Sequence, residues 1–453
     1  MTIQSHSWLI EGTPRDSRLG APPVGGDPGD FSLLGNPSFN ANSLTSTQRL
    51  WYDRMWAGIN RGITNNSPII PINSYTLSDD LYEISRHGNE YVSALLIALR
   101  ATGDLRVLDE VDRLAQRMRS TLRDGNCDGS GKDGHLNWRW RQDPNWELYC
   151  TGWHRMDATL MHSYLAEVAY AFEVNRNLSS PSGVNYAERA DFWKNYLKNH
   201  FEAAWRKYRN IPWPRMDFVI NTGFHPEVDF LRYYYFMHKL YGQVEYYNYF
   251  LTRTNDFTNT LRVQNTEPGG FQMMPTPWGN AALWSQTAPK ASWTVYTGSN
   301  AGRDSREGQA FVYYKSSIMA PASLTLEKAQ GWADGSMMAA IGVSSAYYVM
   351  DTDNMAASNP FARGINGESV VAHPSQGWSF NVNQHSTGRG TLTRFSSSSY
   401  SSPLAFMPQG TARNRFKTIT EAAYNQFTGS SDRENPRDFR IPAYMLLDAM
   451  RNP

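Results

Sequence analysis

Several features that mark whole classes of protein are scarce or missing in this sequence of 453 residues. Its two cysteines, Cys127 and Cys150, are too few for a disulfide framework, and they form either two ordinary thiols or one bridge. Its 43 lysines and arginines balance 42 aspartates and glutamates, which argues against a nucleic-acid-binding protein, because such proteins usually carry a basic excess. No apolar run approaches the roughly 20 residues that a membrane-spanning helix needs.

Targeting and nucleotide-binding motifs are missing too. Residues 1–30 hold no apolar segment behind a basic start, so we expect no signal peptide in this sequence. Either the protein is not exported by that route, or a signal was removed and the protein is secreted or periplasmic. The P-loop, the Rossmann fingerprint and the H-E-x-x-H zinc motif are absent from the sequence, which leaves no basis for a nucleotide-dependent enzyme or a zinc protease.

Aromatic side chains are in surplus: 15 Trp, 25 Tyr and 20 Phe make up 13% of the residues. Charged residues make up 19%, below the roughly 25% of an ordinary soluble domain. Because Trp and Tyr combine an apolar ring face with a polar tip, they suit stacking on sugars as well as packing in a core. The aromatic runs at 233–236 and 246–250 lie in helical repeats, and we expect them in the core.

The chain is expected to divide into an arm and one long helical domain. Residues 1–45 are rich in Gly, Pro, Ser and Asn and are expected to form an extended arm laid on the body. Residues 46–453 are expected to form a single catalytic domain of helical hairpins, because apolar residues recur three and four apart. The expected helix pairs are 90–99 with 107–122, 156–172 with 186–208, 226–240 with 243–252, and 309–326 with 336–350.

The first helix of each pair opens with a polar cluster, and together these clusters predict one rim of a helical toroid. The clusters are Arg86–Glu90, Trp153–Asp157, Asn221–His225 and Arg303–Glu307. We therefore expect an all-α fold, an (α/α)6 or (α/α)7 toroid or incomplete barrel, with long loops that carry binding. The loop 364–394 has alternating stretches and is expected to form a small β-hairpin lid.

The most informative segment is the run 305–321, SREGQAFVYYKSSIMAP. Arg306 and Tyr313 are seven residues apart, within about 20° of two helical turns, so both side chains leave one helix face roughly 10 Å apart. This spacing would direct a cation and a phenol to one substrate. A rim arginine and a packed core tyrosine would show the same spacing.

A second segment places a histidine at the start of a helix. Pro226 suits the first helical turn and disfavours helix in the residue before it, so His225 is expected at a helix N-terminus. The positive end of the helix opposes protonation of the imidazole, which suits it to act as a general base near neutral pH. A histidine that only caps the helix would show the same pattern.

Together, Asn221, His225, Arg306 and Tyr313 form a set with no obligatory carboxylate, which fits β-elimination from a uronate. Arg306 and Asn221 would neutralise the substrate carboxylate beside the weakly acidic C5 proton, so that the developing enolate-like charge is stabilised. His225 would act as base or co-base. Tyr313 would act as the general acid that protonates the leaving O4, and it is a second candidate for the base.

The run 305–321 resembles the signature helix of the alginate lyases of polysaccharide lyase family five. In that family an arginine is followed by alanine four residues on and by the catalytic tyrosine seven residues on, and Arg306, Ala310 and Tyr313 follow this pattern. The resemblance implies an (α/α) toroid, elimination without a metal or cofactor, and a substrate rich in mannuronate or glucuronate.

The family also has an Asn-His pair that opens an earlier inner helix. Asn221 and His225 hold that place in chain order, but here they are not adjacent, and an insertion at 267–299 lengthens the interval to Arg306. These differences suggest a related family, such as the alginate and glucuronan lyases of polysaccharide lyase family thirty-eight.

Other aromatic and cationic residues are candidates for binding the sugar chain. They are Trp153, His154, Arg155, Trp138, Arg139, Arg303 and Trp278. The first three open an expected inner helix and would bind or neutralise a carboxylate, or form only a structural rim. Trp138 and Arg139 lie in an alternating aromatic and cationic stretch, which suits a sugar subsite but also a half-buried strand. Trp278 lies in the long insertion, where it would line or cover a cleft.

A short acidic segment resembles the start of a calcium loop. Asp124, Asn126 and Asp128 match the pattern D-x-N-x-D-G, but the twelfth position is His135 where an EF-hand requires a bidentate glutamate. A solvated Asp/Gly turn explains the same residues, so calcium stays a secondary hypothesis.

The leading hypothesis is a polysaccharide lyase that acts on an acidic polysaccharide as a monomer or weak oligomer, with no nucleic-acid or membrane partner. One alternative is an inverting glycoside hydrolase on the same kind of toroid, with Asp157, Glu227 and Asp229 as its candidate carboxylates. Another is a non-catalytic carbohydrate-binding protein that uses the Trp-rich loops.

Overall fold

The computed structural model describes the helical body of the chain and several short strands. The described residues are 32–64, 78–125, 132–139, 155–209, 224–250, 271–276, 279–284, 361–362, 370–373, 378–381, 389–390, 404–406, 409–426 and 440–453. Most of them are helical, as expected for an all-α protein, and the strands form two-stranded antiparallel sheets. Within these ranges, no helix is both long and apolar enough to span a bilayer.

The first predicted hairpin consists of a long helix, which contains a π-helical turn, and the return helix α5. Its parts are α3 (Leu81–Glu83), a π-helical turn (Ile84–Gly88), α4 (Asn89–Thr102) and α5 (Leu105–Ser120). Gly103 turns the chain with φ at 68°, in the left-handed region that favours glycine. The side chain of Asp104 then caps α5 by accepting a hydrogen bond from the backbone N–H of Arg106.

The polar cluster Arg86–Glu90 does not open this helix, and that prediction is wrong. The helix begins at Leu81, because the carboxylate of Asp80 caps it by accepting from the N–H of Tyr82. Part of the cluster occupies the π-helical turn, a local widening of the helix that is frequent at functional sites.

The second and third predicted hairpins are also present. The second consists of α6 (Arg155–Val174), α7 (Tyr186–Asn195), a π-helical segment (Tyr196–Glu202) and α8 (Ala203–Arg209). The third consists of α9 (Phe224–Tyr241) and a helix over 244–250, joined at Gly242 with φ at 66°. The fourth expected pair, 309–326 with 336–350, lies outside the described residues.

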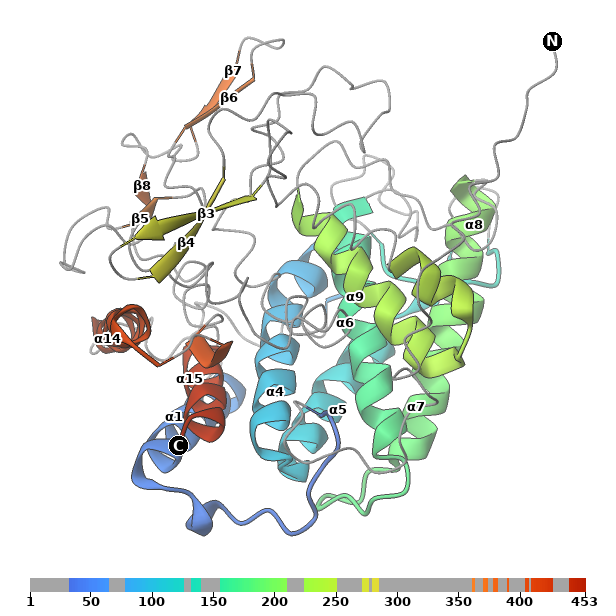
Figure 1. Cartoon of the computed structure of the whole chain (residues 1–453). Coiled ribbons are helices and arrows are strands. Elements are labelled where there is room, and N and C mark those ends of the chain that lie inside the picture. Colours follow the sequence, from blue (N-terminus) through green and yellow to red (C-terminus); the bar gives the residue numbers. More distant parts are fainter. Residues whose placement is uncertain are drawn as a thin grey trace.

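Helices α4, α6 and α9 lie side by side (Figure 1) and run in the same direction. The guanidinium of Arg232 lies 4.1 Å from the ring centre of Tyr164, and further along both helices Tyr170 contacts Phe236. Because both contacts advance toward the C-termini together, α6 and α9 are parallel. The π-helical turn before α4 contacts α6, and Arg100 in the last turn of α4 reaches Glu167, so α4 is parallel to α6 as well.

The C-terminal helices complete the described body on the other side of α4. Helix α15 (Arg440–Arg451) packs against both α4 and α1 (Ser46–Thr64), as Figure 1 shows. Helix α14 (Thr411–Gln426) is tied to α15 by a buried ion pair in which Arg413 donates to Asp448 over 2.6 Å. The first and last α-helices of the described part of the chain are therefore neighbours.

Residues 32–45 of the expected arm lie on the helical body. The amide of Asn175 is fully buried; its oxygen accepts from the N–H of Gly35 and its nitrogen donates to the carbonyl of Leu33. Gly35 packs so closely that a Cβ there would lie 2.2 Å from Cδ2 of Leu105. Residues 1–31 lie outside the described part of the chain.

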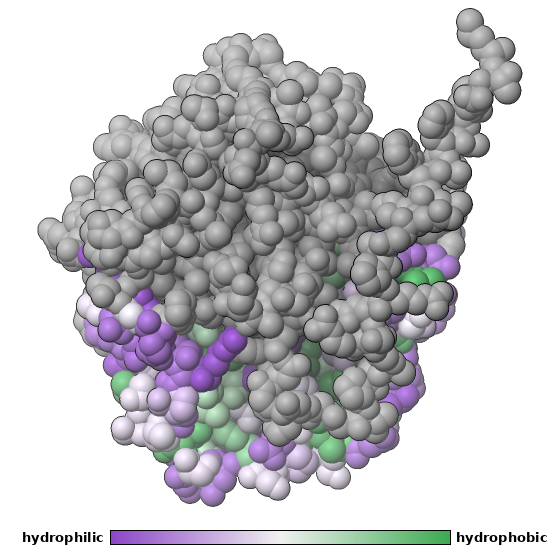
Figure 2. All heavy atoms as spheres, in the orientation of Figure 1, coloured by the Kyte–Doolittle hydropathy of each residue, from purple (hydrophilic) through white to green (hydrophobic). Residues whose placement is uncertain are grey.

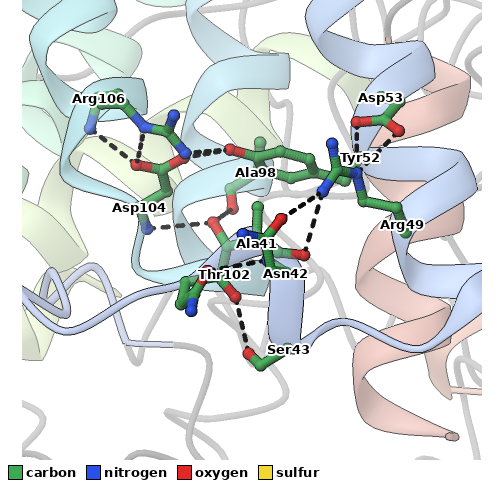
Figure 3. Close-up of polar contacts among 11 residues, drawn as sticks. Ala41, Asn42, Ser43, Arg49, Tyr52, Asp53, Ala98, Thr102, Asp104 and Arg106 are labelled. Atoms are coloured by element: carbon green, nitrogen blue, oxygen red, sulfur yellow. Dashed lines mark hydrogen bonds and ion pairs between the residues drawn. The ribbon is translucent and has the colours of Figure 1, made fainter.

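A polar cluster joins α1 to the start of α5 (Figure 3). The hydroxyl of Tyr52 donates to the buried carboxylate of Asp104 over 2.6 Å, and Arg106 donates to both carboxylate oxygens. Burial and the Asp104 carboxylate both raise the pKa of Tyr52 above its ordinary value, so the phenol stays protonated and keeps donating.

Much of the aromatic surplus lies in the core of the described body. The largest fully buried aromatic side chains are Trp51, Trp138, Trp193, Trp205, Tyr91, Tyr186, Tyr196, Tyr233, Tyr246 and Tyr444. Within the two aromatic runs, Tyr233, Tyr234, Phe236, Tyr246 and Phe250 are buried, as predicted. Figure 2 shows hydrophilic residues over much of the described surface on this face, with apolar residues between them.

The described strands form four short antiparallel pairs. These are β1 (Arg123–Asp124) with β2 (Leu136–Asn137), β3 (Phe271–Thr276) with β4 (Gly279–Trp284), β5 (Phe361–Ala362) with β8 (Arg389–Gly390), and β6 (Val370–His373) with β7 (Trp378–Asn381). A 3-10 turn, Ala41–Ser43, precedes α1, and another, Leu404–Phe406, precedes α14. The hairpin expected in the loop 364–394 is confirmed as β6–β7, while its action as a lid stays a prediction.

Candidate functional site

His225 and Arg155 begin two neighbouring parallel helices. His225 is the second residue of α9 and precedes Pro226, and Arg155 is the first residue of α6. Tyr164 and Glu167 of α6 lie level with Arg232 of α9, so the first turn of α9 lies beside the beginning of α6. The structure therefore gathers these two helix starts at one end of the bundle.

The positive ends of two helix dipoles meet at this end of the bundle. Parallel helices bring their unpaired N-terminal N–H groups together, and each end carries roughly half a positive charge. Such a rim attracts anionic groups, including carboxylates. The backbone of His225 lies at such a helix start, as the sequence predicts.

Most of the other predicted site residues lie outside the described part of the chain. These are Asn221, Arg306, Tyr313, Trp153, His154, Arg303 and Trp278, together with Asn126 and Asp128 of the calcium hypothesis. Their assigned roles therefore remain predictions from the sequence.

Trp138 is a core residue, and its assignment to an open stacking subsite is wrong for this structure. Its side chain is completely buried. The indole N–H donates to the hydroxyl of Thr121 over 2.9 Å and to the carbonyl of Met118. With its nitrogen satisfied inside the protein and its ring packed near His162 and Tyr196, it leaves no face for a sugar.

Arg139 is held at the start of α3. Its guanidinium lies 2.9 Å from the carboxylate of Asp79, and 23% of its side chain is exposed. Its backbone N–H donates to the carbonyl of Asp79, and its carbonyl accepts from the N–H of Leu81. These contacts place Arg139 beside the N-terminus of α3, where it fixes the loop 132–139 to the helix.

Asp124 closes the loop that the calcium hypothesis invokes. Its Oδ1 accepts a hydrogen bond from the backbone N–H of Gly134 over 2.8 Å. The antiparallel pair of β1 and β2 joins the two ends of the same loop. Among the described residues, no three His, Cys, Asp or Glu side chains are grouped so that they could hold a metal ion.

Three charged residues that the sequence analysis did not single out meet between the parallel helices. Glu167 of α6 accepts from Nη2 of Arg100 of α4 over 2.6 Å, and its other oxygen lies 3.5 Å from Nε of Arg232 of α9. The exposed fractions of the three side chains are 10% for Arg100, 1% for Glu167 and none for Arg232. The sequence signal was weak: Glu167 and Arg232 lie within two of the expected helices, and Arg100 directly follows the expected helix 90–99.

His162 is a second buried group that the sequence did not reveal. Its Nδ1 lies 2.6 Å from the carbonyl of Ala158 and its Nε2 lies 3.0 Å from the hydroxyl of Tyr196. Burial lowers the pKa of His162 to about 3, so the imidazole is neutral, with Nδ1–H donating and Nε2 accepting. His162 lies on α6, seven residues after Arg155, the first residue of the helix.

Glu202 is the centre of a third buried polar group, at the end of the π-helical segment. Its carboxylate accepts hydrogen bonds from the hydroxyls of Tyr233 and Tyr246 and pairs with Arg206 and Lys198. Burial raises the pKa of both tyrosines and lowers that of Lys198. These contacts join α8 to α9 and to the helix 244–250.

Comparison with protein-family models, with curated proteins and with solved structures finds no match to this chain.

Proposed function

We infer that the chain is a polysaccharide lyase that cleaves a uronate polymer by β-elimination on an (α/α) toroid. The observation that carries the inference is the parallel set α4, α6 and α9, which gathers the helix starts at Arg155 and His225 at one end. In an (α/α) toroid, one helix of every hairpin lines the inside and all of these inner helices point the same way. The alternation of α4, α6 and α9 with the return helices α5 and α7 agrees with that plan.

The electrostatics of this rim support a polyanionic substrate. A uronate carries one carboxylate on each sugar, and the positive ends of the parallel helices attract such groups. Arg155 adds a cation at the start of α6. Binding a carboxylate to cationic groups acidifies the neighbouring C5 proton, because the charge that develops on its removal spreads onto the neutralised carboxylate.

The proposed reaction assigns one role to each group of the predicted set. Arg306 and Asn221 neutralise the carboxylate, His225 removes the C5 proton, and Tyr313 donates a proton to the departing O4 oxygen. The bond from C4 to O4 breaks as the double bond between C4 and C5 forms, so one polymer yields a new unsaturated end and a new hydroxyl end. The resemblance of the run 305–321 to alginate lyases supports the same assignment.

An ultraviolet assay tests the proposal directly. The full chain is incubated separately with alginate, polymannuronate and glucuronan, and the absorbance of the new C4–C5 double bond is followed. We expect absorbance to rise with at least one polymer. Release of reducing ends without this absorbance would instead select the glycoside hydrolase that uses Asp157, Glu227 or Asp229. Tight binding with no product would select a carbohydrate-binding protein.

A further inference from the structure

The charge cluster of Arg100, Glu167 and Arg232 joins the three parallel helices at one level. One member comes from each of α4, α6 and α9, with 2.6 Å between Arg100 and Glu167 and 3.5 Å between Arg232 and Glu167. The face of Tyr164 covers the guanidinium of Arg232 at 4.1 Å. The described contacts thus link all three helices through a single carboxylate.

The cluster lies on the same helices whose starts, at Arg155 and His225, form the proposed rim. Arg232 follows His225 by seven residues on α9, which is close to two full turns, so both positions share one face of the helix. Glu167 lies on α6, which begins at Arg155, and Arg100 lies on α4, whose helix carries the π-helical turn Ile84–Gly88. A shift of one helix along its neighbour would therefore move the rim residues by the same amount.

Stability alone does not account for three buried charges. Taking charges out of water is costly, and replacing a buried ion pair or triad with apolar side chains of similar volume is often neutral or stabilising. The best-attested use of such groups is to fix the register of packed helices, because a slipped register leaves a charge without its partner. A cluster that spans three parallel helices is suited to that use.

We propose that Arg100, Glu167 and Arg232 are positioning residues, which lock the register of α4, α6 and α9 and thereby hold Arg155 and His225 in the arrangement that the elimination requires. This inference rests on the proposed lyase function. Misplacing a reacting group by about 1 Å can cost roughly a hundredfold in rate, even when the change lies far from the chemistry. The cluster would therefore affect kcat through geometry, without touching the substrate.

The test replaces the whole cluster with apolar residues of similar length: Arg100→Met, Glu167→Leu and Arg232→Met together. If the cluster sets the register, kcat falls by about a hundredfold and KM changes by less than about threefold. The melting temperature stays within about 5 °C, because the three buried charges are replaced together by apolar side chains of similar volume. A variant with unchanged kcat and unchanged melting temperature would overturn the proposal.

A matched control is available in the buried pair of Arg413 and Asp448. This pair has the same 2.6 Å separation and similar burial, with 6% and 1% of the side chains exposed, but it joins α14 to α15. The double variant Arg413→Met, Asp448→Leu should leave kcat unchanged. An equal loss of kcat in both variants would show that any buried ion pair matters in this way, which contradicts a specific positioning role.

Amide hydrogen exchange provides a readout that does not depend on activity. In the triple variant, exchange should speed up in the second and third turns of α6 and α9, whose amides are hydrogen-bonded within the helix, while exchange in α14 stays as in the wild type. Equal protection in both proteins would overturn the proposal. If the triple variant does not fold, Glu167→Gln is measured in the same way, since it keeps the shape and removes the charge. If the wild type acts on no uronate polymer, the lyase function fails, and the exchange result alone decides whether the cluster sets the register.

Discussion

Nε2 of His162 accepts a hydrogen bond from the hydroxyl of Tyr196, 3.0 Å away, and both side chains are fully buried. The imidazole is also stacked on the ring of Phe201, with the two planes 7° apart. Protonating this ring would place a charge in the core and turn its acceptor nitrogen into a donor facing a hydroxyl. The pair joins α6 to the π-helical segment, so its protonation should weaken the second hairpin.

Acid should therefore destabilise the protein through His162. Its pKa is about 3 in the folded protein and near 6.5 in the unfolded chain, so the unfolded state binds the proton first. The stabilisation that the neutral ring provides is complete above pH 6.5 and is lost as the pH falls toward 3. Between pH 7 and pH 4 the loss should be roughly 3 kcal/mol.

Urea unfolding of the wild type and of His162→Gln at several pH values measures this effect. The variant is less stable at pH 7, and the difference between the two proteins should shrink as the pH falls, because the variant has no imidazole to protonate. A difference that stays constant between pH 7 and pH 4 would show that His162 is not the titrating group.

Replacing Glu202 with glutamine should destabilise the protein by about 3 kcal/mol, because it removes a buried charge from two cationic partners and two phenols. Glu188 offers a matched control, since it pairs with Arg119 and Arg189 but 42% of its side chain is exposed. Glu188→Gln should cost less than about 1 kcal/mol. Urea unfolding of the two variants checks the contrast, and equal losses would contradict it.

Asn175→Ala should release residues 32–45 from the body. The change leaves the N–H of Gly35 and the carbonyl of Leu33 without their partner, which costs about 2 kcal/mol for buried groups. Limited proteolysis should then cut within 32–45 faster than in the wild type. Asn36→Ala, which removes only an exposed hydrogen bond to Ser38, should leave the cleavage rate unchanged. Equal cleavage of wild type and Asn175→Ala would show that other contacts hold this segment.

A chelator should leave the melting temperature unchanged. The calcium hypothesis needs Asp124 as a ligand, but its Oδ1 already accepts from the N–H of Gly134, and position 135 is a histidine where the EF-hand has a glutamate. Thermal melts with and without EDTA make the measurement. A fall of more than about 3 °C with EDTA that calcium reverses would establish a structural metal in this loop.

The helical hairpins were predictable because their signals are local. Apolar residues three and four apart located α4, α5, α6, α7 and α9 to within a few residues, and Gly103 and Asp104 marked the turn between α4 and α5. The start of α3 at Leu81 was not predicted, because it is marked only by the short helix-capping pattern Asp80–Glu83. The β3–β4 hairpin was missed because the segments Phe271–Thr276 and Gly279–Trp284 do not alternate apolar and polar residues.

The candidate site was less predictable, because burial depends on contacts between distant segments. The alternating stretch at Trp138 and Arg139 allowed both a sugar subsite and a half-buried strand, and only its packing near His162 decided for the core. The cluster of Arg100, Glu167 and Arg232 joins residues up to 132 positions apart, and no spacing rule links them. By contrast, the place of His225 at a helix start followed from Pro226 alone.

The absorbance assay applied to the wild type and to Tyr313→Phe together tests the central claim most directly. Removing one hydroxyl deletes the proposed proton donor and changes little else, so the rate of double-bond formation should fall by at least about a hundredfold. The melting temperature should stay within about 2 °C of the wild type, as for a change that affects only the chemistry. Wild-type rates in Tyr313→Phe would contradict the assigned role, and absence of the absorbance with alginate, polymannuronate and glucuronan alike would contradict the lyase itself.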